Sequence, residues 1–256
     1  MRSGRRVTAA DVATLIGAGV LAGVVSTVAG LASLVSYPVL LALGLPPLAA
    51  NVTNTVALTF TSAGAAAGSR PELAGQGRRV RRLGLVTALG GAAGAALLLL
   101  TPPGGFESVA PALIAGASLL LLAQPLIRRP AGPAGGERSR PLQAAVFGVA
   151  VYVGYFGAAG GILMLAVLSS LLNEPLARIN AVKNVVSGVA NAVAAIGFAV
   201  FGPVRWTFVV PLAAGFLVGG WVGPAVVRRV PGPALRVVVG VAGLAVAVRL
   251  GVTAYR

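Results

Sequence analysis

The sequence predicts an all-α polytopic membrane protein. Of its 256 residues, 57% are hydrophobic and only 10% are charged, and the mean hydropathy is +0.93, whereas an average soluble domain carries about 25% charged residues. Apolar runs recur from Val12 to the C-terminus, and roughly 20 apolar residues form a helix long enough to cross the hydrocarbon core. We therefore expect a multi-pass protein embedded in the lipid bilayer of the cell inner membrane or plasma membrane.

Apolar segments define the expected helices. They lie at 12–30, 31–46, 48–68, 83–100, 109–127, 142–160, 161–173, 176–201, 207–227 and 234–253. The stretch 128–140 between the fifth and sixth segments is polar, basic and rich in Pro and Gly, which is typical of a linker. We thus expect a first transmembrane repeat over 1–127, a linker over 128–141 and a second repeat over 142–256.

The net charge of +15 is explained by membrane topology rather than by nucleic acid, which we do not expect as a partner. Arginines lie between the apolar segments, and the loops 69–82 and 128–140 together hold nine arginines against two glutamates. Positively charged loops remain cytoplasmic during membrane insertion. We therefore expect both loops to be cytoplasmic.

The first two apolar segments of each half run together and must be interrupted. Asp11 to Gly44 as one helix would be about 50 Å long, which exceeds the thickness of the bilayer. Gly30 and the pair Gly160-Gly161 are the natural points for a break. Short, glycine-interrupted segments at matching places in two halves indicate a binding site, because freed backbone groups are tolerated at membrane depth only where they line a cavity.

Two span counts are compatible with these breaks. If the short second piece of each half is re-entrant, about eight full spans and two short helices result, and both termini are inside. If the short pieces cross fully, ten spans form two inverted halves. Each arrangement violates the positive-inside rule once, and we favour eight spans.

The two halves show a repeated pattern at an offset of 130 residues. Ala29-Gly30 then falls on Ala159-Gly160, and Asn54 falls on Asn184. Each half contains an apolar helix, a glycine break, a short apolar helix and an asparagine-bearing helix. Transporters are often built from such duplications, although chance agreement in Ala/Gly/Val-rich sequence is the competing explanation.

A single lysine lies within an apolar segment and is the leading candidate for a functional residue. Lys183 is the only lysine among 20 basic residues, and an ionisable residue inside a span costs about 2.5 to 3.5 kcal/mol on insertion scales. The alternative is a lysine near a helix end that reaches the interface or pairs with Glu174. Polar residues with helical spacing lie beside it, at Asn180, Asn184, Ser187 and Asn191.

The first half has a similar polar stripe in the helix after Pro47, which includes Asn51, Asn54 and Thr55. Such side chains can simply join helices through interhelical hydrogen bonds. Two stripes beside two glycine breaks instead favour one shared site. The candidate substrate-binding residues are Lys183, Asn184, Asn180, Asn191, Ser187, Asn54, Asn51, Thr55, Gly30, Gly160 and Gly161.

The residue types at this candidate site favour an anion. The site offers amide and hydroxyl donors, helix ends and one ammonium, whereas none of the five acidic residues lies in the middle of a span. Cysteine and histidine are absent from the chain, and no serine lies beside a plausible base. We therefore expect a transporter rather than an enzyme, with no cofactor and no metal.

The sequence resembles the TauE/SafE family of sulfite exporters, also known as the 4-toluene sulfonate uptake permease family. The resemblance depends on two glycine-broken apolar hairpins, Gly17 to Leu58 and Val151 to Ala195, of which the second contains the elements GAAGG and NAVKN. The first departs from the family pattern, because it has Ala29-Gly30-Leu31 where members usually have a run of glycines. The resemblance implies a duplicated protein of about seven to nine spans that transports sulfite, sulfonates or related organic anions, here as an exporter.

The competing function is a membrane scaffold or assembly protein with no transported substrate. Such a protein would need neither Lys183 nor the helix breaks. The partners we expect are a small anion and the bilayer, and a homo-oligomer is compatible with the sequence.

Overall fold

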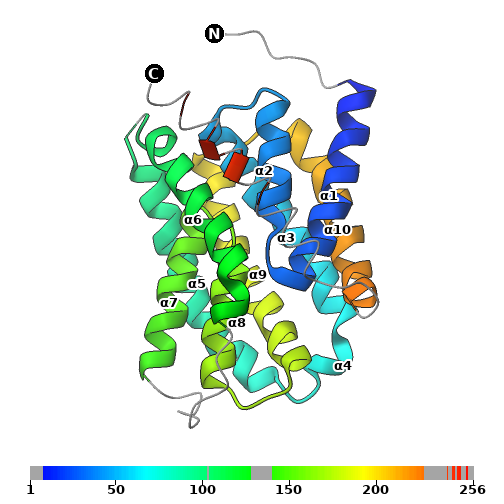
Figure 1. Ribbon diagram of the computed structural model, residues 1–256, viewed down its shortest axis with the longest axis vertical. Coiled ribbons are helices and arrows are strands. Elements are labelled where there is room, and N and C mark those ends of the chain that lie inside the picture. Colours follow the sequence, from blue (N-terminus) through cyan, green and yellow to red (C-terminus); the bar gives the residue numbers. More distant parts are fainter. Residues whose placement is uncertain are drawn as a thin grey trace.

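The computed structural model describes residues 8–102, 104–127 and 140–227, together with the isolated positions 241, 244, 245, 247, 248 and 252. The continuous described ranges form helices and no strands, which confirms the all-α prediction (Figure 1). The helices are α1 (Ala9–Ala29), α2 (Ala32–Ala42), α3 (Pro47–Gly68), α4 (Arg70–Leu73), α5 (Gly77–Leu100), α6 (Gly105–Ile127), α7 (Arg140–Tyr155), α8 (Gly160–Leu171), α9 (Leu176–Phe201) and α10 (Trp206–Val227).

Several helices have the length and composition of membrane spans. Within the described residues, four are long and apolar enough to cross a membrane: Ala9–Thr27, Gly77–Leu100, Leu176–Phe201 and Trp206–Gly223. Shorter apolar helices accompany them in α2, α6 and α8. The count of eight full spans stays a prediction, and the expected segment 234–253 lies largely outside the described residues.

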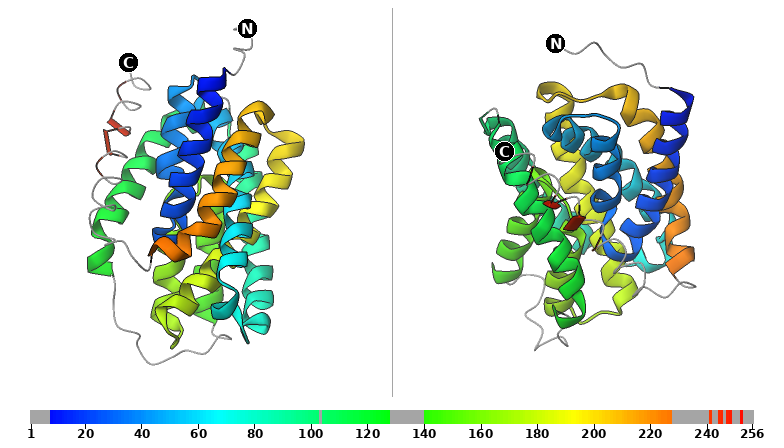
Figure 2. Two further views of the ribbon diagram at one scale, coloured as in Figure 1. Left: turned by 90° about the vertical axis from the view of Figure 1, so that its right-hand side faces the viewer. Right: turned by 45° about the horizontal axis from the view of Figure 1, so that its top comes forward.

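Close glycine contacts show that α1, α3 and α10 run in the same direction. A Cβ atom on Gly19 would lie 3.0 Å from the backbone nitrogen of Phe216, and one on Gly23 would lie 2.9 Å from the Cα atom of Gly219. Gly64 of α3 likewise meets Trp221. Because α1 and α3 are parallel, α2 must run back between them. Residues 9–42 therefore form a first hairpin, with α1 packed along α10 (Figure 2).

The second half contains the same arrangement at the opposite end of the molecule. Gly90 of α5 meets Ala150 of α7, and Gly94 meets Tyr155, so these two helices are parallel. Helix α5 also packs along α9. Residues 140–171 form a second hairpin that begins and ends at the end holding α4, which is the lower end of Figure 1. The first hairpin begins and ends at the upper end.

The structure corrects one aspect of the favoured eight-span arrangement. That arrangement places the start of α3 at the end opposite to the start of α1, whereas both helices start at the upper end. The short helix α2 returns the chain to the side from which α1 entered. The loop 69–82 and the start of α7, which follows the loop 128–140, share the lower end (Figure 1). That this end is cytoplasmic stays a prediction.

The helix breaks lie at or next to the expected glycines. Helix α1 ends at Ala29, and Gly30 has a φ of 70°, which confirms the first break. The second break lies earlier than expected, at 156–159, where Gly157 and Ala159 have φ values of 75° and 56°. Gly160 and Gly161 instead begin α8. The polarity of α8's neighbouring glycines hid this boundary, because Ala158 and Ala159 continue the apolar pattern.

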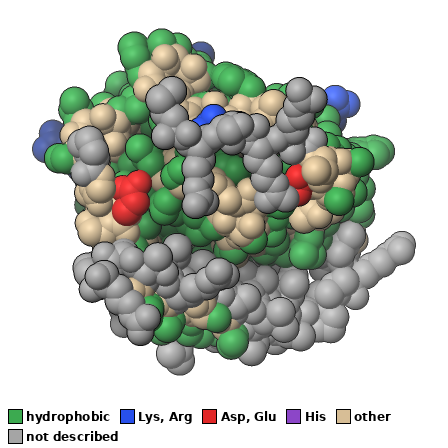
Figure 3. Space-filling model, turned by 90° about the horizontal axis from the view of Figure 1, so that it is seen from above, with side chains coloured by type: hydrophobic (Ala, Val, Ile, Leu, Met, Phe, Trp, Pro, Cys, Tyr) green, Lys and Arg blue, Asp and Glu red, His purple; other side chains and the backbone are tan. Residues whose placement is uncertain are grey.

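The start of α5 also differs from the expectation. This helix begins at Gly77 rather than near residue 83. Its first turns carry Arg78, Arg79, Arg81 and Arg82, which are absent from an apolar pattern although arginine is a good helix former. Seen from the upper end, by contrast, the described side chains are mainly hydrophobic or uncharged, with few charged groups (Figure 3).

The packing of α5 against α7 predicts the effect of adding one methyl group. In Gly94→Ala the new Cβ atom would collide with the carbonyl oxygen of Val151, and overpacking of this kind costs about 1 to 3 kcal/mol. We expect a lower thermal unfolding midpoint in detergent. The control is Gly148→Ala, because a Cβ atom there meets nothing within 4 Å and the midpoint should be unchanged or slightly higher. Equal midpoints for the two variants would contradict the packing described here.

Candidate functional site

The two hairpin breaks touch each other inside the molecule. A Cβ atom on Gly161 would lie 2.5 Å from the Cα atom of Gly30, and one on Gly30 would collide with Gly161 in the same way. Gly30 also needs a left-handed backbone conformation, which glycine adopts at little cost. Glycine is therefore required at this crossing for both space and conformation. The crossing brings the first hairpin, the second hairpin and α9 together.

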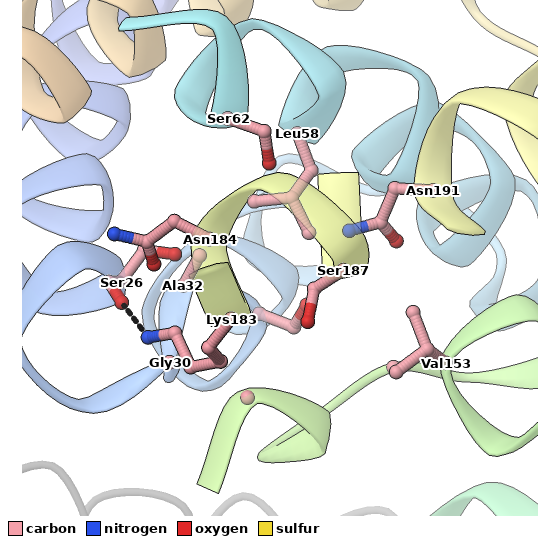
Figure 4. Close-up of a pocket in the computed structure, with 13 residues that line it drawn as sticks. Ser26, Gly30, Ala32, Leu58, Ser62, Val153, Lys183, Asn184, Ser187 and Asn191 are labelled. Atoms are coloured by element: carbon pink, nitrogen blue, oxygen red, sulfur yellow. Dashed lines mark hydrogen bonds between the residues drawn. The ribbon is translucent and has the colours of Figure 1, made fainter. Parts of the chain in front are cut away.

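A small cavity lies beside this crossing and is lined by all four of its neighbouring elements. Its volume is about 40 Å³, which is room for about three water molecules. Gly30, Gly161 and Gly157 contribute backbone to its wall. The polar side chains that line it are Ser26, Ser33, Ser62, Lys183, Asn184, Ser187 and Asn191 (Figure 4).

Lys183 is buried at the end of α1 and is the only charged residue in the wall of this cavity. Its side chain is 1% exposed, and its Nζ atom donates to the carbonyl oxygen of Ser26 at 3.4 Å (Figure 4). The C-terminal end of a helix carries a partial negative charge that favours a nearby cation. An ammonium has three donors, and this is its only hydrogen bond within the described residues. The remaining donors can serve a ligand.

Two further donors in the cavity wall have no partner in the described part of the chain. They are the Nδ2 atom of Asn184 and the Oγ atom of Ser187. Buried polar groups are nearly always hydrogen-bonded, and each exception needs an explanation. With Lys183 they form a set of donors from one face of α9. A small anion that accepts from several of them would satisfy the whole set.

The counterpart of Asn184 in the first half shows why these donors are free. Asn54 accepts a hydrogen bond from Ser36 at 2.6 Å and donates one to Ser33 at 3.1 Å, and both serines belong to α2. At the offset of 130, the corresponding positions of α8 are Leu163 and Ala166, which offer no hydroxyl group. The asparagine of α9 therefore lacks the partners that satisfy the asparagine of α3.

Two other asparagines join each half to the hairpin of the other. Asn180 of α9 donates to the carbonyl oxygen of Thr27 at 2.9 Å, and Asn51 of α3 donates to that of Tyr155 at 3.0 Å. Both carbonyls lie in the last turn before a hairpin break, where the helix supplies no further N–H donor. These asparagines stabilise the breaks rather than line the cavity.

The structure thus brings together six of the candidate residues and places five elsewhere. Lys183, Asn184, Ser187, Asn191, Gly30 and Gly161 line the cavity, whereas Asn180, Asn51, Asn54, Thr55 and Gly160 do not. Thr55 donates to the carbonyl of Asn51 in its own helix, and Gly160 packs against Val153. Sequence reasoning missed Ser26, Ser33 and Gly157. Gly157 belongs to the same GAAGG run as Gly160 and Gly161, which was a usable signal.

The link between Asn180 and α1 predicts a loss of stability without a change in charge. Asn180→Leu keeps the approximate size but leaves the Thr27 carbonyl without a donor, so we expect the free energy of unfolding to fall by about 0.6 to 1.7 kcal/mol. Thermal unfolding in detergent measures the change. Thr14→Val is the control, because the Thr14 hydroxyl bonds only to Ala10 in its own exposed turn. An unchanged midpoint for Asn180→Leu would show that this bond does not hold the break.

Comparison with known proteins gives a family for this arrangement. No curated protein and no solved structure matches the chain significantly. A family model described as "Sulfite exporter TauE/SafE" matches residues 15–250, a range that includes both hairpins, their breaks and every residue that lines the cavity. That range is nearly the whole chain, and the protein therefore belongs to the TauE/SafE family of sulfite exporters, a family of membrane transporters.

Proposed function

We propose that this protein exports a small oxyanion of the sulfite or sulfonate class and binds it in the central cavity beside Lys183. The observation that carries the proposal is the set of donors on α9, in which one buried ammonium and two unpartnered polar groups face a cavity without a carboxylate in its wall. Charge-assisted hydrogen bonds to an anion are about twice as strong as neutral ones. Binding would therefore offset part of the cost of burying the lysine.

The size of the cavity favours a small anion within this class. A volume of about 40 Å³ suits an ion of a few atoms, such as sulfite. An aromatic sulfonate would need the hairpins to move apart. We therefore propose sulfite or a similarly small oxyanion as the preferred substrate, and larger sulfonates as weaker ones.

The two hairpins suggest how the site could open to each side of the membrane. They enter from opposite ends and meet at the Gly30 and Gly161 contact, which lies beside the cavity. Movement of one hairpin would expose the site toward one end, and movement of the other hairpin would expose it toward the other end. Broken helices at the centre of a membrane are used in this way by other transporters.

A scaffold without a substrate is the alternative, and purified protein in liposomes separates the two functions. Efflux of sulfite, sulfate, methanesulfonate, 4-toluenesulfonate and acetate should be compared with protein-free liposomes. We expect flux with sulfite to exceed flux with 4-toluenesulfonate. Inside-out membrane vesicles should accumulate sulfite if the direction is export. Flux equal to that of empty liposomes for every anion would favour the scaffold.

The role of Lys183 predicts a loss of transport on removal of its charge. Lys183→Met keeps the length of the stem and removes the ammonium, so we expect sulfite flux to fall at least tenfold while expression and unfolding midpoint are retained. Lys183→Arg should keep part of the activity, because the charge survives although the donor geometry changes. Ser170→Ala is the control, since Ser170 is exposed on α8 outside the cavity. Normal transport by Lys183→Met would exclude an electrostatic role for this lysine.

A further inference from the structure

We propose a second anion-binding site at the lower end of the molecule, which takes a sulfate- or phosphate-like oxyanion. The site is a cavity of about 600 Å³ between the start of α5 and the loop that joins α8 to α9. Its polar lining consists of Gln76, Arg78, Arg79, Glu174 and Arg178. It shares no lining residue with the central cavity, and the proposal does not depend on transport.

Two arginines of this site are held in place by one carboxylate. Arg79 donates to Glu174 at 3.1 Å and to the side-chain oxygen of Gln76 at 2.6 Å, and Arg178 contacts the other oxygen of Glu174 at 3.5 Å. The side chains of Arg79 and Glu174 are 14% and 21% exposed. The guanidinium groups are therefore oriented before any ligand arrives, which reduces the entropy cost of binding.

The charges at this cavity do not balance. The hydrogen bond from Arg79 is the main influence that lowers the pKa of the Glu174 carboxyl, against an opposing effect of burial, so Glu174 stays ionised at neutral pH. Three guanidinium groups then face one carboxylate, which leaves an excess of two positive charges. Arg78 is exposed and has no ion pair within the described residues. Glu72, the other acidic residue of the loop 69–82, does not line the cavity.

The excess charge and the kind of donor define the ligand. Guanidinium groups present forked donors that match the geometry of phosphate and sulfate oxygens, and an excess of two charges suits a dianion. The same chemistry is offered by a free oxyanion and by the phosphate of an anionic lipid headgroup, which basic pockets at the cytoplasmic ends of helices can bind. The positive-inside rule accounts for arginines at this end, but it does not require three of them to converge on one cavity.

Binding to the purified full-length protein tests the proposal. Sodium sulfate should be titrated into protein in detergent at constant ionic strength, with sodium chloride as the reference, and followed by calorimetry and by the unfolding midpoint. The Lys183→Met background removes the charge of the central cavity and should retain this binding. In that background, Arg78→Gln should weaken sulfate affinity at least fivefold. Arg81→Gln is the matched control, because it removes the same charge from an exposed position of α5 outside the cavity.

A second variant tests the site in the opposite direction. Glu174→Gln removes the internal carboxylate while it keeps hydrogen-bonding capacity, so the affinity for sulfate should rise several-fold. This result would not follow from a purely structural ion pair, whose loss would lower stability and leave sulfate binding unchanged. The Arg78 and Glu174 variants remain informative if Arg79→Gln fails to fold.

A lipid arm distinguishes the two sources of the oxyanion. Protein should be purified from nanodiscs of phosphatidylcholine with or without phosphatidylglycerol, and the retained lipids should be identified by native mass spectrometry. Phosphatidylglycerol that is lost in Arg78→Gln but kept in Arg81→Gln would assign the site to a headgroup. Sulfate binding with the same dependence would assign it to a free anion. If neither ligand responds to Arg78→Gln or Glu174→Gln, the proposal is wrong.

Discussion

The requirement that every backbone polar group be hydrogen-bonded inside a membrane governs this structure. Breaking a helix at membrane depth releases carbonyl groups that neither water nor lipid can satisfy. At the first break, Lys183 and Asn180 donate to the carbonyls of Ser26 and Thr27. At the second, Asn51 donates to Tyr155, and the Tyr152 hydroxyl donates to Ala158 at 2.6 Å. The polar residues of α3 and α9 thus make the breaks possible.

The central cavity arises where the two halves stop matching. Asn54 is fully engaged by hydroxyl groups of α2, whereas Asn184 faces apolar residues of α8 and keeps a free donor. Lys183 corresponds to Thr53 at the offset of 130, and Thr53 accepts a hydrogen bond from the backbone of Arg205 instead. A similar framework therefore holds a closed polar cluster in one half and an open one in the other. The difference depends on a few side chains and not on the course of the backbone.

Periodicity and chain length predicted the helices and the first break, because a continuous helix of 34 residues does not fit a bilayer and Gly30 was the weakest point. They did not predict the direction of α2, since hydropathy measures the length of a segment but not the side to which it returns. Lys183, Asn184 and Ser187 were found because their spacing places them on one face of α9. Ser26 and Ser33 were missed, because a serine in an apolar helix carries no periodic signal. The separate duties of Asn180 and Asn184 depend on contacts with another helix, which one stripe of sequence cannot reveal.

The packing of α1 along α10 has a consequence for the assembly of the chain in the membrane. The glycines of α1 that allow this close approach, Gly19 and Gly23, meet Gly215 and Gly219, which are synthesised close to 200 residues later. Until then the first hairpin has inserted without its main neighbour, and its freed carbonyls must await Asn180 and Lys183. Contacts between residues this far apart form late and slowly. The earliest part of the protein to leave the ribosome is therefore among the last to reach its final packing, which lengthens its exposure to membrane quality control.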